Sequence, residues 1–203
     1  MSSTYERHPL GLPRGSVRAI LSIVITLSLW AYLVFNPADG SILRVPSYLY
    51  CLTILIYVFF AAHRVTIGPT APGQHAPLYL PRGTLRFLIL GGTIAILIWQ
   101  FLVDPQRILT KLTPTGEMMH GWPYLSLSLM GGFTVGWLFS HGPWRNSPWY
   151  QDLQAWLSLV AMCVLFVNLF IDLIAKTQAH SPDWLYWDCV IIAILSLYYG
   201  ARS

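Results

Sequence analysis

Six long apolar runs constrain this chain more than any other feature of its sequence. They lie at residues 17–35, 48–62, 85–103, 122–140, 153–175 and 184–199. A helix needs about 20 mostly apolar residues, with a range of about 17–25, to cross the hydrocarbon core of a bilayer. The second and sixth runs reach that length only if aromatic residues at their starts, Tyr48 and Trp184, lie among the lipid headgroups. The sequence therefore predicts an all-α, polytopic integral membrane protein with six transmembrane helices.

The composition agrees with a membrane environment. Only 10% of the 203 residues are charged, while 55% are apolar. A soluble domain carries about 25% charged residues, so this chain has too few to cover its surface in water. The net charge of +4 is small and scattered, which predicts membrane lipids as partners and no nucleic acid. The three cysteines are far apart, and the histidines and acidic residues show no metal-binding spacing, so we expect neither a disulfide framework nor a metal site.

The basic residues predict the orientation in the membrane. Six spans would place both termini on one side. That side would carry Arg7, Arg14, Arg18, Arg64, Arg82, Arg86, Arg145 and Arg202, and the other side Arg44, Arg107, Lys111 and Lys176. When the loops of a membrane protein are short, basic residues collect in the loops on the cytoplasmic side of the membrane. We therefore expect a multi-pass protein of a cell inner membrane, or an equivalent energy-transducing membrane, with both termini in the cytoplasm.

A basic phrase occurs twice. Residues 13–18 read PRGSVR and residues 81–86 read PRGTLR, 68 residues later. The pairs Asn36-Pro37 and Asp104-Pro105 follow at the same offset. Proline and glycine each make up only about one residue in fifteen to twenty, so these shared pairs indicate an internal duplication rather than chance similarity between apolar helices.

A third copy is predicted in a degenerate form. At twice the offset, Asn36 corresponds to Asp172 and Pro46 to Pro182, but the basic phrase is absent. We therefore expect a single membrane domain, residues 1–203, of three tandem helical hairpins. The hairpins would span approximately residues 13–64, 81–141 and 149–200. Two-helix units keep the same orientation, so these would be parallel repeats.

The arginines of the repeated phrase require a physical explanation. Ser16 and Thr84 suit the capping position at the start of a helix. Cations near that end oppose the helix dipole by about 0.3–1 kcal/mol each, so we expect an anion nearby. The candidate residues for a lipid phosphate or another anion are Arg14, Ser16, Arg18, Arg82, Thr84 and Arg86. Two alternatives remain, namely positive-inside topology without a specific ligand, and a carboxylate on a partner subunit.

Ionisable residues are absent from the middles of the six runs, where they would mark a transport path. One candidate ion site near the outer surface comprises Asn168, Asp172 and Asp188, although Asp172 could instead pair locally with Lys176. His63 and His141 end the second and fourth runs. They could ligate a haem or pigment, but a histidine at a helix C-terminus also stabilises the dipole, and we favour this structural role. No cofactor is predicted beyond phospholipid.

Small residues recur at every fourth position of the fourth run, at Ser128, Gly132, Gly136 and Ser140. Such a face lets another membrane helix approach closely. Its partner could lie in this chain, with Gly91-Gly92 as a candidate, or in another subunit.

These features together favour a non-catalytic integral membrane subunit, acting as a scaffold, assembly or lipid-contacting component of a larger membrane protein complex. The interiors of the runs are free of charge, and the short loops leave no room for a soluble catalytic domain. Its partners would be membrane lipids and other membrane subunits. The alternative is a small transporter or channel built from the three parallel repeats. A membrane enzyme is the weakest hypothesis, because no cluster of His, Asp or Glu recurs on one side.

Overall fold

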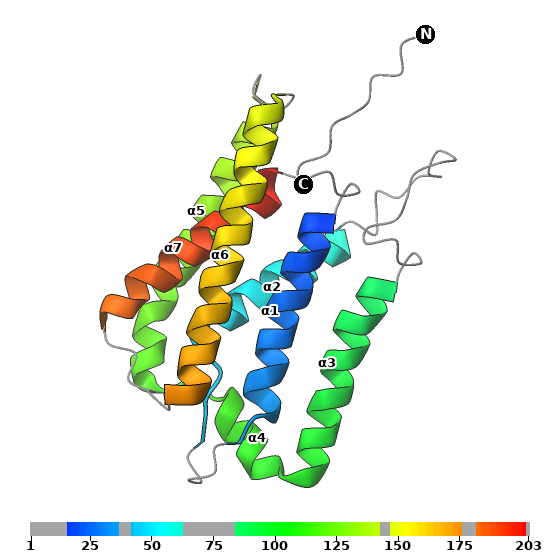
Figure 1. Ribbon diagram of the computed structural model, residues 1–203. Helices are drawn as coiled ribbons and strands as arrows, with labels where there is room; N and C mark the ends of the chain where they lie inside the picture. The colour runs from blue at the N-terminus through cyan, green and yellow to red at the C-terminus, as the bar shows by residue number, and fades with distance from the viewer. Residues whose placement is uncertain (1–15, 37–41, 63–83, 143–146, 176–181, 202–203) are drawn as a thin grey trace.

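The computed structural model describes residues 16–36, 42–62, 84–142, 147–175 and 182–201. This part of the chain is all-α (Figure 1). Its helices are α1 (Ser16–Val34), α2 (Ser47–Ala62), α3 (Thr84–Val103), α4 (Pro105–Leu112), α5 (Gly116–Ser140), α6 (Pro148–Ala175) and α7 (Pro182–Ala201). Within these residues, three stretches are long and apolar enough to cross a membrane, namely α1, α3 and residues Pro148–Ile171 of α6.

The remaining apolar helices fall outside that group for different reasons. α2 and the apolar part of α7, residues Leu185–Ala201, are shorter. α5 has 25 residues, but glycine, serine and threonine interrupt its apolar side chains. Each predicted apolar run nevertheless forms one helix.

The described part holds one helix more than the six predicted, because α4 forms in the loop after α3. Asp104 is its N-cap, and its carboxylate oxygen accepts a hydrogen bond from the Arg107 backbone N–H at 3.0 Å. Pro105 takes the first helical position, where a missing N–H costs nothing. The Asp-Pro pair that was predicted to end one helix therefore also starts the next.

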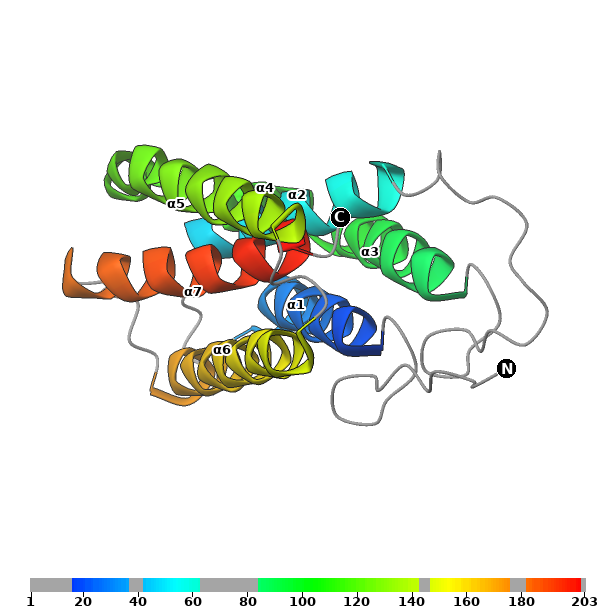
Figure 2. The same cartoon turned by 90° about the horizontal axis from the view of Figure 1, so that it is seen from above.

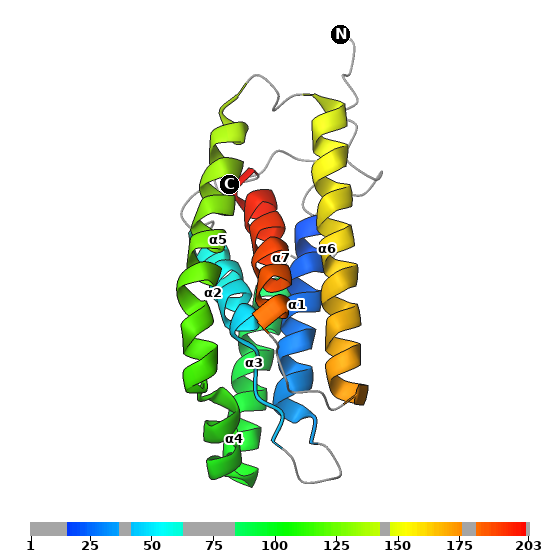
Figure 3. The same ribbon diagram turned by 90° about the vertical axis from the view of Figure 1, so that its left-hand side faces the viewer.

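The long helices alternate in direction. α1, α3 and α6 begin at the end of the bundle where α2, α5 and α7 finish (Figures 1 and 3). α1 packs against α2, α3 and α6, while α7 packs against α2, α5 and α6. Seen from above, α1 lies near the centre and α3 at one edge, with α5 on another side (Figure 2). The first residue of α1 and the last of α7 thus lie at the same end of the bundle.

The predicted middle hairpin, residues 81–141, does not form a closely packed pair of helices. α1 packs on α2, and α6 packs on α7. α3 instead packs on α1 and α4, while α5 packs chiefly on α7 and also on α2. The α4 helix is inserted between α3 and α5, and it gives the chain enough length to place them apart.

The core is apolar and lies between α1, α2 and α7. Its fully buried large side chains include Leu21, Ile25, Tyr32, Leu33, Leu49, Leu52, Ile56, Ile192, Leu195 and Tyr199. Large apolar side chains also cover the outside, for example Leu102 on α3 and Leu127 on α5, which are 77% and 75% exposed. An apolar exterior over an apolar core is the arrangement expected of helices in lipid.

Candidate functional site

The most distinctive site is the arginine–phenylalanine cluster, which comprises Arg18, Arg86, Phe59 and Phe60. The guanidinium carbon of Arg18 lies 5.0 Å from the centre of the Phe59 ring, and that of Arg86 lies 5.9 Å from the centre of the Phe60 ring. A cation within about 6 Å of an aromatic face is attracted to it. Corresponding arginines of the two repeated phrases therefore contact neighbouring side chains near the end of α2.

The Arg18 half of this cluster belongs to the core. The Phe59 ring meets Tyr199 of α7 edge-on, with centroids 5.2 Å apart. The Tyr199 hydroxyl lies 2.7 Å from Ser22 Oγ, which donates to the backbone carbonyl of Arg18 at 2.8 Å. Because that bond uses the one Ser22 proton, Tyr199 is the donor to Ser22. These contacts tie α1, α2 and α7 together.

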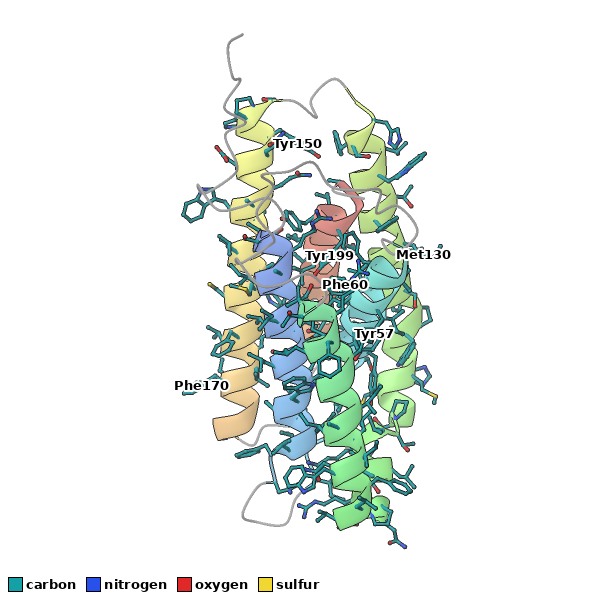
Figure 4. All side chains as sticks on the ribbon, turned by 90° about the vertical axis from the view of Figure 1, so that its right-hand side faces the viewer. Tyr57, Phe60, Met130, Tyr150, Phe170 and Tyr199 are labelled. Carbon is teal, nitrogen blue, oxygen red and sulfur yellow. The ribbon has the colours of Figure 1, made fainter. Side chains whose placement is uncertain are left out.

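The Arg86 half lies at the edge of the bundle. Thr84 and Arg86 are half-buried, while the next side chain, Phe87, is 80% exposed. Phe60 and Tyr199 lie near one another behind the start of α3, whereas Met130 and Phe170 point away from the bundle (Figure 4). α3 therefore brings its copy of the phrase to the outside of the molecule.

Of the other four predicted anion-binding residues, two lie within the described residues and two lie outside them. Ser16 and Thr84 are the first residues of α1 and α3, and Ser16 is buried. Arg14 and Arg82 lie outside the described residues. Each copy of the basic phrase therefore has one described arginine, Arg18 in the first and Arg86 in the second.

The small-residue face of α5 packs on α7. A methyl group built on Gly132 would lie 2.5 Å from the carbonyl oxygen of Ala193, and one on Gly136 would lie 2.8 Å from the backbone nitrogen of Ala201. Both positions therefore require glycine for the observed approach of the helices.

Serines lie along the same face of α5. The Ser128 carbonyl accepts a long hydrogen bond of 3.5 Å from Ser196 Oγ on α7. Ser140 is buried, and its hydroxyl donates to the Trp137 carbonyl at 2.6 Å.

Gly91-Gly92 of α3 was the predicted partner of this face within the chain, and that prediction is wrong. Gly92 lies instead under the Trp30 ring of α1, where an added methyl group would be 2.5 Å from two ring atoms. Trp30 Nε1 also donates to Thr93 Oγ1 at 3.0 Å. α3 is therefore held to α1 by a tryptophan, and this leaves α5 free to pack elsewhere.

Of the two candidate histidine ligands, the structure describes His141, which has local contacts. His141 is the C-cap of α5, with Nδ1 2.9 Å from the Trp137 carbonyl oxygen and 3.0 Å from Ser140 Oγ. Its exposed ring lies against Trp137. These contacts are those of a helix-capping side chain. His63 lies outside the described residues.

The candidate ion site is described only in part. Asn168 is half-buried on α6, and Asp188 is buried on α7. The side chain of Asp172 and all of Lys176 lie outside the described residues. Within the part of the chain that the structure describes, no group of three or more His, Cys, Asp or Glu side chains could hold a metal ion.

Hydroxyl groups inside the long helices are satisfied by their own backbone. Each donates to the carbonyl four residues earlier, at 2.6–2.9 Å; these residues are Ser22, Thr26, Ser28, Thr53, Thr93 and Ser158. This bonding lets a polar side chain sit in an apolar environment at little cost. Two of these hydroxyls, those of Ser22 and Thr93, also accept a hydrogen bond from a neighbouring helix.

Lys111 is a site that the sequence analysis missed. Its side chain is 2% exposed, and Nζ donates to the carbonyls of Tyr32, Leu33 and Phe35 at 3.2, 2.8 and 2.8 Å. The last carbonyls of a helix have no partner within it, so Lys111 of α4 completes the C-terminus of α1. Burial, with a smaller effect of Arg107, lowers the pKa of Lys111 to about 8. The Asp104-Pro105 start signal could have revealed α4, but only the folded chain places it beside α1.

α4 is fixed to α2 as well as to α1. The Tyr50 hydroxyl donates to the Leu112 carbonyl at 2.9 Å, and the Val45 backbone N–H donates to the Lys111 carbonyl at 3.2 Å. The short helix thus contacts the end of α1, the first turn of α2 and Val45 just before α2. These contacts lie at the end of the bundle opposite the arginine–phenylalanine cluster.

Comparison with known proteins does not assign a class. No model of a known protein family matches the chain, and neither the curated proteins nor the solved structures give a significant match. Function must therefore be argued from these sites alone.

Proposed function

We propose that the chain is a non-catalytic, six-span integral membrane subunit that acts as a scaffold or lipid-contacting component of a larger complex. Its termini would lie in the cytoplasm and its helices in a cell inner membrane or an equivalent one. The observation that carries this proposal is an apolar core inside an apolar exterior, with hydroxyls bonded to their own helices. Such a bundle offers contact surface in lipid but little polar chemistry.

The three-hairpin organisation is supported by burial at the predicted offset. Ser22 and Leu29 of α1 correspond to Ser158 and Leu165 of α6, and all four are buried. The two serine hydroxyls also make the same bond, each to the carbonyl four residues earlier. A shared pattern of both burial and bonding favours common descent of the two helices.

The starts of the second helices support the same organisation. Pro46, Pro114 and Pro182 are spaced 68 residues apart, and each lies at or just before the start of α2, α5 or α7. A proline suits the first turn of a helix, where its missing N–H is not needed. Three prolines at a constant spacing support the proposed three-hairpin organisation.

The subunit proposal is tested by purification. The tagged full-length chain, extracted in a mild detergent at native expression level, should co-purify with at least one other membrane protein in constant proportion. Mass spectrometry identifies that protein, and an unrelated tagged membrane protein of similar size serves as the control. Isolation only as a lone monomer or homo-oligomer would count against the proposal.

One observation favours the alternative of a small transporter or channel. Asp188 is buried within α7, where its side chain is only 6% exposed. A buried carboxylate in a membrane helix often belongs to a transport path. Loss of substrate or ion flux in vesicles on Asp188→Asn would support this function, whereas unchanged flux on Asp188→Asn and on Asp172→Asn would remove the proposed site.

A further inference from the structure

We infer that Arg86, at the start of α3, binds the headgroup of an anionic phospholipid. Its counterpart Arg18, at the start of α1, contacts the protein core instead. This inference rests on the proposed placement of the bundle in a membrane. It separates two sites that are nearly identical in sequence.

Arg18 and Arg86 are both half-buried, but the residues around them differ. Arg18 contacts Phe59, which is only 8% exposed, and its neighbours Val17 and Ala19 are buried. Arg86 contacts Phe60 at the edge of the bundle, beside the exposed Phe87. Among the described residues, none supplies a carboxylate to Arg86, and the first turn of α3 contains no acidic residue. An anion from the surroundings is therefore the complementary partner for Arg86.

The surface below Arg86 fits acyl chains. An exposed stripe of large apolar side chains runs along α3 at intervals of three and four residues, comprising Phe87, Leu90, Ile94, Ile98 and Phe101. This spacing keeps the side chains on one face of a helix. A phosphate at Arg86 and hydrocarbon along this stripe together describe a phospholipid and not a free phosphate ion.

The equivalent face of α1 is closed. Its residues at the 68-residue offset are Ala19, Ser22, Thr26, Trp30 and Leu33. Four of them are buried, and Trp30 is half-buried with its ring against Gly92 of α3. The same positions in the two helices thus face protein in α1 and the surroundings in α3. A lipid can lie beside the second copy only.

The test compares Arg86→Gln with the matched variant Arg18→Gln. Each full-length protein is reconstituted with equal amounts of phosphatidylglycerol and phosphatidylcholine, and the lipids retained after delipidation are counted by native mass spectrometry. The wild-type protein should retain phosphatidylglycerol preferentially. Arg86→Gln should reduce this preference about fivefold, the factor one basic residue contributes near an anionic surface. Arg18→Gln should keep the preference but unfold at a lower temperature.

Three results would overturn the inference. One is a wild-type protein with no preference for phosphatidylglycerol, which can be measured without any variant. The second is an equal loss of preference in both variants when each is folded. The third is an unchanged lipid preference in Arg86→Gln, which would reject the lipid site without affecting the subunit proposal. The readout uses the isolated chain, so failure to co-purify a protein partner leaves the inference intact.

Discussion

At the scale of single residues, Lys111 shows how one cation can complete a helix to which it does not belong. A helix C-terminus carries a partial negative charge and carbonyls without donors. Nζ of Lys111 satisfies three such carbonyls at the end of α1 from a fully enclosed position. Burial of the amine carries a cost, and its effect is visible in the lowered pKa of about 8.

Lys111→Met should destabilise the protein by about 1–3 kcal/mol, because the methionine fills a similar volume but leaves buried carbonyls without donors. Thermal unfolding in detergent, followed by circular dichroism, measures this change. Thr110→Ala is the matched control on the same helix, since Thr110 makes only an exposed local bond to the Gln106 carbonyl, and it should stay within about 0.5 kcal/mol of the wild type.

The pH dependence provides a second check on Lys111. Its folded pKa of about 8 lies below the ordinary value of 10.5, so between these values the unfolded chain binds more protons than the folded one. The stability contributed by this group therefore rises with pH across that window. The stability difference between the wild type and Lys111→Met should widen from pH 8 to 10.5. A constant difference would show that the pKa of Lys111 is the same in the folded and unfolded protein.

At the scale of helices, α5 and α7 form the most extensive contact in the described fold. Lipid tails give no hydrophobic drive for helices to associate, so close backbone packing must supply the attraction. Gly132 and Gly136 provide it on α5, and Gly200 provides it on α7, where an added methyl group would lie 3.0 Å from the carbonyl carbon of Phe133. Small residues on both helices let the two backbones approach.

Gly132→Ala should destabilise the bundle by about 1–3 kcal/mol, because the new methyl group would meet the backbone of Ala193 and force the helices apart. Gly131→Ala is the matched control one residue away. That position is exposed and has no atom within 4 Å of a built methyl group, so alanine should be neutral or stabilise the helix by up to about 1 kcal/mol. Equal effects of the two substitutions on the unfolding temperature would contradict the packing argument.

At the scale of the whole molecule, the start of α1 and the end of α7 lie at one side of the bundle (Figures 1 and 3). The arginine–phenylalanine cluster lies at the same side. The opposite side carries α4 and the Lys111 contacts. The proposed orientation places the arginine-rich side in the cytoplasm, since basic residues in short loops resist translocation.

Reporter fusions test that orientation. In a bacterial inner membrane, a fluorescent protein fused after Ser203 should fluoresce, because it folds in the cytoplasm. Alkaline phosphatase fused after residue 176 should be active, because that loop would lie on the other side. The reverse pattern would invert the topology, and activity of both reporters at one position would contradict a single orientation.

The sequence by itself determined the six apolar helices to within six residues at each end, because the length of an apolar run and the signals at a helix start are local properties. It missed α4, a short helix whose start signal followed directly on the end of α3. It could not determine the partners of Gly132 or Lys111, because each contact joins segments far apart in the chain. Nor could it separate Arg18 from Arg86, whose phrases are nearly identical. Tertiary packing decided that difference, since α1 is enclosed by its neighbours and α3 is covered on only one side.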